Sequence, residues 1–401
     1  MLVARVAGDS YGTVTAGARR GLGPGRVWSA VSMRILITGA AGFLGSHIVD
    51  AAVAAGHEVR GTDSLAAAVH ATRPTYWPDD VELVVGDIRD PAVIGQALRG
   101  VDAVCHEAAM VGLGVDLSDL PAYCDVNVTG TATLLAEMGR RQIPRLVLAS
   151  SMVVYGEGAY DCPAHGRVQP PPRERADLVQ GRFEPRCPVC GAALGTAPVT
   201  EDAPLDPRNS YAVTKVAQEN LAAVWAELTG GSAVALRYHN AYGPRMPRDT
   251  PYSGVAAIFR SALAAGQPPR VFEDGAQQRD FVHADDIAAA NLLAVSAGRA
   301  GHLRAYNIAS GEPHTIGQMA LALARAYGGP DPAVTGEFRL GDVRHIVASP
   351  ARARSELGFV ARTPFSSGMA EFAHAPLREP ATGGGLQPGS SRPAASVGPA
   401  V

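Results

Sequence analysis

The chain has 401 residues, 47% of them hydrophobic, which is enough to bury a sizeable core. Its formal net charge is −3, so neither nucleic acid nor a negatively charged membrane surface is indicated as the main partner. It has no apolar run as long as a signal-peptide core or a membrane span, and an odd number of cysteines, five. We therefore expect a cytoplasmic protein with reduced thiols or thiolate metal ligands rather than a disulfide framework.

Regular structure is predicted to begin at Met33, because residues 1–32 show no periodicity and are expected to form a disordered extension. From Met33, apolar runs alternate with helical patterns. Strands are predicted at 34–38, 58–62, 82–85, 102–106 and 145–150, and helices at 43–55, 91–98 and 121–139. Strands that alternate with helices favour an α/β fold with a doubly wound parallel sheet, here over residues 33–243.

The second half of the chain is less regular. A proline-rich stretch that includes "QPPPRER" interrupts the pattern, so residues 157–200 are predicted to be an insert. A helix is predicted at 210–229, followed by a strand in "AVALRYHN". Residues 244–375 are expected to form mainly a smaller α+β substrate-binding lobe, and the Gly-, Pro- and Ser-rich residues 376–401 a disordered tail.

A glycine-rich turn follows the first predicted strand, in "ILITGAAGFLGSHIV". Glycine lets the backbone turn sharply and approach a pyrophosphate that sits on the free N–H groups of the next helix. Such turns also occur for packing alone, but the position between strand and helix indicates a Rossmann dinucleotide site. The residues assigned to it are Gly39, Gly42, Phe43, Leu44 and Gly45.

Further cofactor contacts are predicted at the ends of the next strands. Asp63 stands where a carboxylate can accept hydrogen bonds from the adenosine ribose and would repel a 2′-phosphate, so NAD is favoured over NADP. The alternative is an ordinary solvated acid at a strand end. Asp87 and Ile88 are predicted to border the adenine, and Ala108 is included in the cofactor-binding set.

Three more motifs, "LASSMVVYG", "SYAVTK" and "LRYHNAYGP", accompany the glycine turn. Together they resemble the extended short-chain dehydrogenase/reductase family of NAD-dependent nucleotide-sugar epimerases and dehydratases. The resemblance implies that Ser151 is the catalytic hydroxyl and that Tyr211 and Lys215 form the YxxxK pair. Four residues apart on a helix, these two share a face, so the ammonium can lower the phenol pKa and the phenolate can take a sugar proton. The alternative is an ordinary tyrosine and lysine on a surface helix.

The resemblance also implies the roles of several other residues. Asn127 is expected behind the active site as a structural and proton-relay residue, and Tyr238 beside the cofactor. Asn240 and Arg279 are expected to bind the substrate, a nucleotide-diphosphate sugar, with Arg279 gripping phosphate oxygens; its alternative is a salt bridge to a neighbouring aspartate. A homodimer is implied as well, in which the helices at 121–139 and 210–229 form a four-helix bundle.

The two residues that follow Ser151 indicate the type of reaction. A 4,6-dehydratase of this family carries an Asp-Glu pair there, whereas this chain has Met152 and Val153, which cannot move a proton. A reaction that needs only oxidation and re-reduction remains, most simply epimerisation at C4 of the sugar. Ser151 and Tyr211 are 211 − 151 = 60 positions apart. The long segment between them resembles that of proteins assigned as dTDP-L-rhamnose 4-epimerases. A nucleotide-sugar reductase or dehydrogenase, a UDP-sugar 4-epimerase and a non-catalytic NAD-binding regulator remain as alternatives.

The insert contains two short-gapped pairs, Cys162 with His165 and Cys187 with Cys190. A C-x-x-H and a C-x-x-C supply the ligand set of a closed tetrahedral zinc site. Four ligands leave no open position, so the zinc is predicted to be structural and to order a zinc-knuckle-like insert near the active site. The alternative is two exposed thiol pairs with an incidental histidine.

Overall fold

The structure is a computed structural model, and it describes residues 32–67, 69–70, 74–112, 117–248 and 254–378. The extension predicted at 1–32 lies outside the described residues except for Ser32, and the tail predicted at 376–401 lies outside them except for residues 376–378. No helix among the described residues combines the length and the apolar character needed to cross a membrane.

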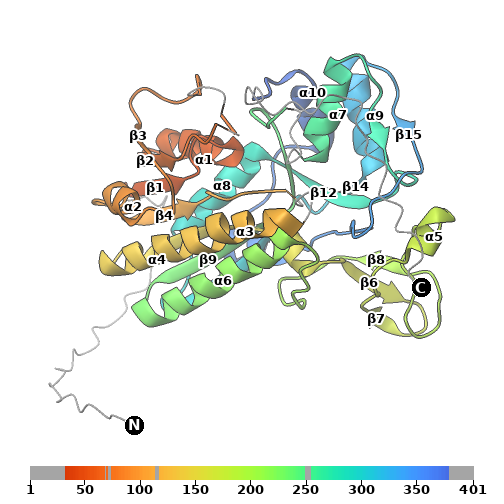
Figure 1. Cartoon of the computed structure of the whole chain (residues 1–401), viewed down its shortest axis with the longest axis horizontal. Coiled ribbons are helices and arrows are strands. Elements are labelled where there is room, and N and C mark those ends of the chain that lie inside the picture. Colours follow the sequence, from red (N-terminus) through yellow and green to blue (C-terminus); the bar gives the residue numbers. More distant parts are fainter. Residues whose placement is uncertain (1–31, 68, 71–73, 113–116, 249–253, 379–401) are drawn as a thin grey trace, which may run out of the picture. The chain divides into compact units, whose positions relative to one another are not determined.

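A seven-stranded parallel sheet forms the centre, in the order β13-β9-β5-β4-β1-β2-β3 (Figure 1). The strand order reverses between β1 and β4, and in sheets of this type ligands bind at the carboxyl ends of the strands beside such a reversal. The predicted doubly wound α/β fold is confirmed. The strands are β1 (Arg34–Thr38), β2 (Glu58–Asp63), β3 (Glu82–Val85), β4 (Ala103–His106), β5 (Arg145–Ser151), β9 (Ser232–Tyr238) and β13 (His302–Ile308).

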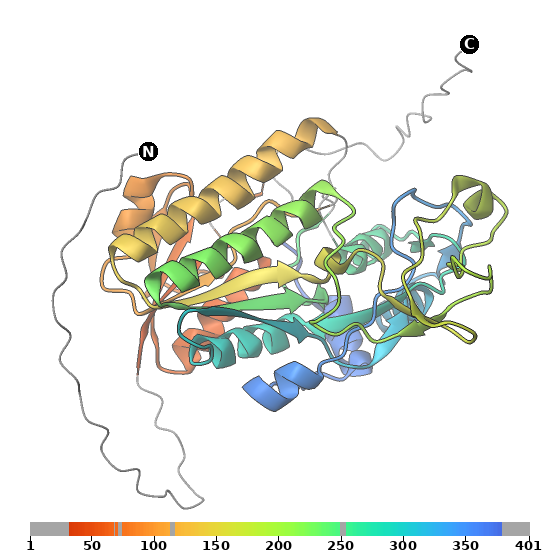
Figure 2. The same ribbon diagram turned by 90° about the horizontal axis from the view of Figure 1, so that it is seen from below.

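Helices cover both faces of the sheet because alternate side chains of each strand point to opposite sides. In β1, Ile35 and Ile37 pack in one apolar cluster with α1 and α8, whereas Leu36 packs in another with α2, α4 and α6. Figure 2 shows the long helices on one side of the sheet and α8 on the other. The helices are α1 (Phe43–Ala54), α2 (Pro91–Ala97), α4 (Gly130–Arg140), α6 (Ser210–Thr229) and α8 (Ala284–Val295).

The helix predicted at 121–139 is interrupted in the structure. It consists of α3 (Leu120–Tyr123), a π-helical turn (Cys124–Thr129) and α4, after a short 3₁₀ turn (Leu117–Asp119). Asn127 lies in the π turn, where its amide accepts from the backbone N–H of Met110 at 2.7 Å and donates to the carbonyl of Met110 at 2.9 Å. A π turn often marks a functional position in a helix, and this one places Asn127 against α6.

A second apolar core lies beyond the carboxyl ends of the strands and is built from α7, α9 and α10. Residues 244–375 also supply α8, β13 and a π turn (Ala353–Leu357) to the main sheet and its covering layer. The elements of this second core and its small sheets are β10 (Asn240–Tyr242), α7 (Val255–Ala264), β11 (Arg270–Val271), β12 (Gln278–His283), β14 (Pro313–Thr315), α9 (Ile316–Tyr327), β15 (Ala333–Val334) and α10 (Phe365–His374).

The insert leaves the main sheet after a 3₁₀ turn (Met152–Tyr155) and forms a small antiparallel sheet of its own, in the order β7-β6-β8. The apolar cluster inside this sheet has only four buried residues: Tyr160, Cys162, Cys187 and Leu194. So small an apolar cluster contributes little to ordering some forty residues. The elements of the insert are β6 (Ala159–Cys162), β7 (Gly166–Val168), α5 (Arg175–Val179) and β8 (Gly195–Ala197).

Candidate active site

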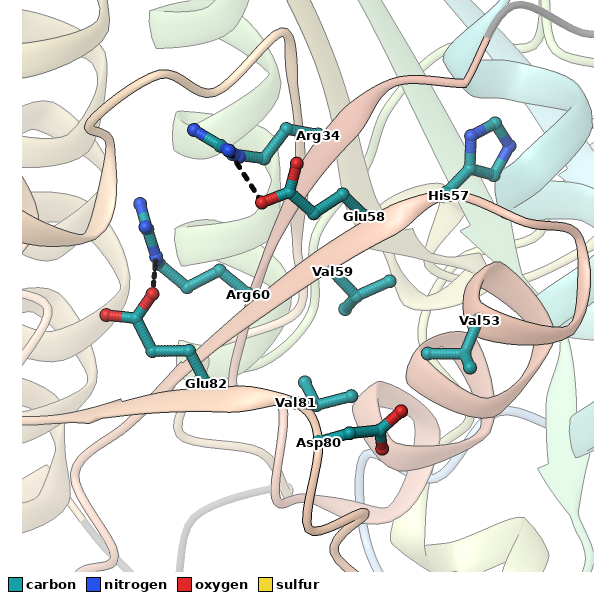
Figure 3. Close-up of a pocket in the computed structure, with 9 residues that line it drawn as sticks. All are labelled: Arg34, Val53, His57, Glu58, Val59, Arg60, Asp80, Val81 and Glu82. Carbon is teal, nitrogen blue, oxygen red and sulfur yellow. Dashed lines mark hydrogen bonds and ion pairs between the residues drawn. The ribbon is translucent and has the colours of Figure 1, made fainter.

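One hollow of the molecule, about 220 Å³, lies at the amino ends of β1, β2 and β3 (Figure 3). The ion pairs Arg34–Glu58 and Arg60–Glu82, each at 2.6 Å, border it. Ligands of open α/β sheets bind at the opposite, carboxyl edge. The candidate site is therefore sought at the other end of these strands, where the sequence motifs lie.

The glycine turn lies at this carboxyl edge, between β1 and α1. Gly39 has φ +62°, and a Cβ there would come within 2.8 Å of the backbone of Ala108. A Cβ on Gly45 would lie 2.2 Å from the carbonyl oxygen of Gly39, so neither position accepts a larger residue. Gly42 is the N-cap of α1 and no side chain caps the helix, which begins with Phe43 and Leu44. A helix N-terminus without a side-chain cap suits an anion.

The Asp63 carboxylate lies beside the turn, accepting hydrogen bonds from the backbone N–H of Ala41 at 3.0 Å and of Leu65 at 2.9 Å. The arrangement fits the predicted adenosine side of a dinucleotide site. Asp87 instead pairs with Arg89 at 2.6 Å, and Arg89 lowers the pKa of this carboxyl. Ile88 is buried among the residues that pack under α2 and α4. Their roles at the adenine remain predictions.

Ser151, Tyr211 and Lys215 meet at the carboxyl end of β5. Ser151 ends this strand, and Tyr211 lies in the first turn of α6, whose N-cap Asn209 accepts from the N–H of Ala212 at 2.8 Å. The Ser151 side chain is close enough to Tyr211 to lower the pKa of its phenol, and the Ser151 hydroxyl accepts from the backbone N–H of Val153 at 3.4 Å. The Lys215 ammonium lies 5.6 Å from the centre of the Tyr211 ring and donates to the carbonyl of Ala149 at 2.9 Å. The three residues predicted from the motifs thus form one group.

The charges at this group differ from the expected pattern. Burial raises the pKa of Tyr211, the nearby Glu107 raises it further, and the Ser151 side chain lowers it. Burial also lowers the pKa of Lys215 to about 8, against the opposing effect of Glu107 and Glu219. The expected lowering of the phenol pKa by the ammonium is not observed: burial has the largest effect on Tyr211 and raises its pKa, because a buried site disfavours an isolated charge.

Asn127 connects the active-site helix to the loop after β4, since its amide donates to the hydroxyl of Thr214 at 2.9 Å. Tyr238 is buried, and its hydroxyl donates to Glu107 at 2.9 Å. The Oδ1 atom of Asn240 is buried and accepts no hydrogen bond from any described residue, as suits a group that awaits a ligand. Arg279 donates to backbone carbonyls of residues 278, 343 and 344 at 2.6 to 2.9 Å, so its predicted role in phosphate binding remains a prediction.

The sequence contains two signals that its motifs alone did not bring out. Lys215 is the only lysine of the chain; the other 35 − 1 = 34 basic residues are arginines. The single lysine thus stands at the position that the YxxxK motif predicts, and its compact ammonium differs from the planar guanidinium of arginine. The second signal is Glu107, a carboxylate that directly follows the buried strand β4 and accepts a hydrogen bond from Tyr238.

The four predicted metal ligands converge in the insert, and their ligand atoms all lie within 4.8 Å of one another. The Sγ atoms of Cys162 and Cys190 are 3.7 Å apart, and the Nδ1 atom of His165 lies 3.5 Å from Cys162 Sγ and 3.6 Å from Cys187 Sγ. Zinc–sulfur and zinc–nitrogen bonds of about 2.3 and 2.0 Å place the corners of a tetrahedron about 3.5 to 3.8 Å apart. The donor set therefore fits zinc in both chemistry and spacing.

The sequence matches the NAD dependent epimerase/dehydratase family model over residues 35–176 and 187–309. Among curated proteins, the chain is 33% identical to a dTDP-L-rhamnose 4-epimerase of Burkholderia thailandensis, over 84% of this chain and 93% of that protein. It is 31% identical to a UDP-glucose 4-epimerase of Mycolicibacterium smegmatis, over 84% of this chain and 97% of that protein.

A solved structure agrees with these similarities. The crystal structure of the UDP-glucose 4-epimerase of Thermus thermophilus in complex with NAD superposes with a TM-score of 0.68 at 29% identity, covering 85% of this chain and 98% of that one. The residues matched by the family model include the glycine turn, Ser151 and Tyr211. The comparisons and the geometry thus agree on one type of site.

Proposed function

Since the chain belongs to the NAD-dependent epimerase/dehydratase family, we propose that it is a nucleotide-sugar 4-epimerase, most similar in activity to dTDP-L-rhamnose 4-epimerases. The observation that carries this proposal is the meeting of Ser151, Tyr211 and the sole lysine at the carboxyl edge of a dinucleotide-binding sheet. The reaction would invert the configuration at C4 of the sugar.

The residues present fit NAD. The uncapped N-terminus of α1 would hold the pyrophosphate, Asp63 the adenosine ribose, and Tyr211 with Lys215 the nicotinamide ribose. When bound, NAD supplies the hydride acceptor that is later the hydride donor, so it is recycled in every turnover.

Tyr211 acts as base and then as acid in this proposal. It takes the proton of the sugar C4 hydroxyl while the C4 hydrogen leaves as hydride, and Ser151 hydrogen-bonds the same oxygen. The resulting keto sugar rotates within the site, so that the opposite face of C4 is presented to the returning hydride. Tyr211 then returns the proton to the oxygen as hydride adds to the opposite face of C4. Dehydration is disfavoured because Met152 and Val153 follow Ser151 and carry no acid or base.

The experiment that tests this function is incubation of the purified protein with dTDP-L-rhamnose and with a panel of other dTDP- and UDP-sugars. We expect NMR to show inversion at C4 without added reductant. Build-up of one NADH per product would identify a dehydrogenase, and conversion of UDP-glucose in preference to the dTDP-sugar would favour the UDP-sugar 4-epimerase, which a 31% identical relative makes the second candidate. Binding of NAD without turnover of any sugar would favour a regulator.

For the insert, we propose a structural zinc held by Cys162, His165, Cys187 and Cys190. The support is the tetrahedral spacing of the four donor atoms and the small apolar cluster around them. The zinc would order the insert and take no part in the chemistry, since four protein ligands leave no open position.

Elemental analysis of the purified protein should find about one zinc per chain. The double variant Cys187→Ser with Cys190→Ser should lose the zinc and become sensitive to protease within residues 160–195, while NAD stays bound. Cys105→Ser, which changes a buried cysteine of the main core, is the matched control and should keep the zinc. Metal-free protein with full activity and an intact insert would contradict the assignment.

We also propose a homodimer formed through α6 and the helix that contains α3 and α4. The support is an exposed apolar stripe on α6, where Val213, Val224 and Leu228 are 48%, 54% and 80% exposed. The neighbouring helix exposes small residues, Ala132 and Ala136, which allow a second helix to approach closely.

A further inference from the structure

The loop after β10 reaches back to the cofactor side of the candidate site. β10 ends at Tyr242, and Pro244 and Arg245 then contact α1, whose N-terminus would hold the pyrophosphate. The ring of His47 on α1 donates from Nε2 to the carbonyl of Pro244 at 3.0 Å. The guanidinium of Arg245 forms an ion pair with Asp50, also on α1, at 2.7 Å. Two contacts therefore fasten this loop to the cofactor-binding helix.

Arg245 has an unusual backbone conformation. Its φ is +64°, in the left-handed region that is unfavourable for residues with a Cβ. Glycine would adopt this φ without strain, so the arginine costs stability at this position. Two hydrogen bonds hold the backbone there: the N–H of Arg245 donates to the carbonyl of Pro376, and the N–H of Arg378 donates to the carbonyl of Met246, each at 2.8 Å. Strain that the surrounding structure maintains in this way often marks a functional position.

The side chain of Arg245 covers Tyr76, which belongs to the segment between β2 and β3. The guanidinium carbon lies 4.7 Å from the centre of the Tyr76 ring, a cation–π contact. The same guanidinium is paired with Asp50, so it is held against the ring from the side of α1. Arg245 thus fixes the half-buried ring of Tyr76 in one position.

The hydroxyl of Tyr76 is bonded to the glycine turn. It donates to the carbonyl of Ala41 at 2.7 Å, and Ala41 stands between Gly39 and Gly42. The N–H of Ala41 donates at 3.0 Å to Asp63, the carboxylate expected at the adenosine ribose. The N–H of Gly42 belongs to the same peptide unit as the Ala41 carbonyl and donates to the carbonyl of Gly39 at 3.0 Å. Tyr76 therefore fixes the peptide that leads into the N-terminus of α1.

We propose that Arg245 is a positioning residue for the dinucleotide, which acts through Tyr76 to preorganise the glycine turn and so slows the release of NAD. The inference rests on the proposed function, in which NAD stays bound from one turnover to the next. A turn whose backbone is already ordered loses less conformational freedom when the ligand binds, and this strengthens binding. The strained arginine thus lowers the stability of the chain and improves the retention of its cofactor.

Arg245→Gly tests this role because glycine removes the side chain and also relieves the backbone strain. Protein loaded with radiolabelled NAD is chased with unlabelled NAD, and the loss of label gives the dissociation rate. We expect the variant to release NAD about fivefold faster or more, the size expected when one partly buried cation–π contact is lost. The unfolding temperature of the NAD-free variant should not fall. A residue with only a structural role would not give this combination.

The matched control is Gln142→Gly, which relieves the same kind of strain at an exposed residue with φ +55° between α4 and the amino end of β5. It should release NAD at the wild-type rate. Tyr76→Phe keeps the ring under the guanidinium and removes the bond to Ala41, so it should also speed the release of NAD. Arg245→Gly should add little in the Tyr76→Phe background, because Arg245 acts through that hydroxyl.

The outcomes separate this inference from the proposed function, since the release of NAD is measured without any sugar. Arg245→Gly protein that releases NAD at the wild-type rate would overturn the role of Arg245. Fully additive effects of Arg245→Gly and Tyr76→Phe would overturn the route through Tyr76. Faster and non-additive release in a protein that epimerises no sugar would support the positioning role and overturn the proposed function instead.

Discussion

Lys215 is 2% exposed, and its ammonium donates to the carbonyl of Ala149 at 2.9 Å. Burial lowers its pKa, so the folded protein binds this proton less tightly than the unfolded chain does. The resulting destabilisation is fully present below the folded pKa, about 8, and is lost as the pH rises toward the ordinary lysine value. Such a site lowers the stability of the folded protein and holds a positive charge at a defined position.

We expect Lys215→Met to abolish turnover, weaken NAD binding and yet raise the stability of the NAD-free protein. The gain should be largest at pH 7 and should shrink toward pH 10, because only the charged ammonium is penalised. Urea unfolding at the two pH values measures it. A variant less stable than the wild type at pH 7 would show that the ammonium is a net stabiliser.

Tyr211→Phe removes the proton-transferring oxygen and leaves the ring in its contact with Tyr123, at 6.3 Å between ring centres. We expect turnover to fall by a factor of about 10² or more while NAD binding persists. Single-turnover kinetics and the NAD content of the purified variant are the measurements. Near-normal turnover would rule out Tyr211 as the base.

At the scale of single residues, the motif residues could be predicted from local sequence. Tyr211 and Lys215 are four residues apart on one helix, and Ser151 ends a predicted strand. The hydrogen bond from Tyr238 to Glu107 could not be predicted, because it joins residues that are 131 positions apart in the sequence. The bonds of Arg279 to the carbonyls of residues 343 and 344 depend likewise on a distant segment. Contacts between strands far apart in sequence leave no local pattern.

Among the elements, the insert is connected to the second core through several polar contacts, and Arg344 is at the centre of one such group. Arg344 is fully buried and donates to Glu184 of the insert at 2.5 and 2.9 Å, to Glu273 at 2.7 Å and to Asp274 at 2.7 and 2.9 Å. Glu184 also bonds the ring of His345 at 2.8 Å. The insert is thus joined to the segment whose carbonyls hold Arg279.

We expect Glu184→Gln to raise the KM for the nucleotide sugar several-fold with a small change in kcat, because it leaves part of the buried Arg344 charge uncompensated and loosens the segment beside Arg279. NAD and zinc content should not change. Asp161→Asn, in an exposed pair with Arg167 elsewhere in the insert, is the matched control. Equal KM values for the two variants would show that the insert does not act on the substrate.

The order of strands and helices was predictable from hydrophobic periodicity, which is strong for buried parallel strands. The break at Asn127 was not, because the residues around it continue a helical pattern and the π turn arises from the tertiary contact of Asn127 with Met110 and Thr214. The Cys/His cluster of the insert could be predicted from spacing alone, because two short-gapped pairs of metal-binding residue types are visible without knowledge of the surrounding fold.

At the scale of the whole molecule, α6 has two faces that differ in character. Its buried face carries Lys215, and its exposed face carries Val224 and Leu228. A partner on the exposed face would fix the helix and the residues on its other side. Assembly and catalysis would then depend on the same element.

Val224→Glu with Leu228→Glu is expected to convert a dimer at micromolar concentration to a monomer, as seen by sedimentation velocity, because two buried carboxylates would face their copies across the bundle. The control is Val334→Glu, a 60% exposed valine on β15 outside the proposed interface. Sedimentation of the wild-type protein as a monomer would contradict the proposed dimer.

The buried group around Arg344 also bears on how the chain reaches its fold. Arg344 is hydrogen-bonded to Glu184, 160 residues away in the sequence, and Tyr155 to Asn307, 152 residues away. Val199 and Ala348 form an isolated β-bridge. Such long-range closures make folding slow and leave intermediates with unpaired charges. A nascent chain that ends before residue 344 presents Glu184 and Glu273 without their common partner. The bonds of Arg344 to Glu184, Glu273 and Asp274 can therefore form only after residue 344 has been synthesised, whereas the Arg173–Glu273 pair, which also joins the insert to this segment, can form earlier.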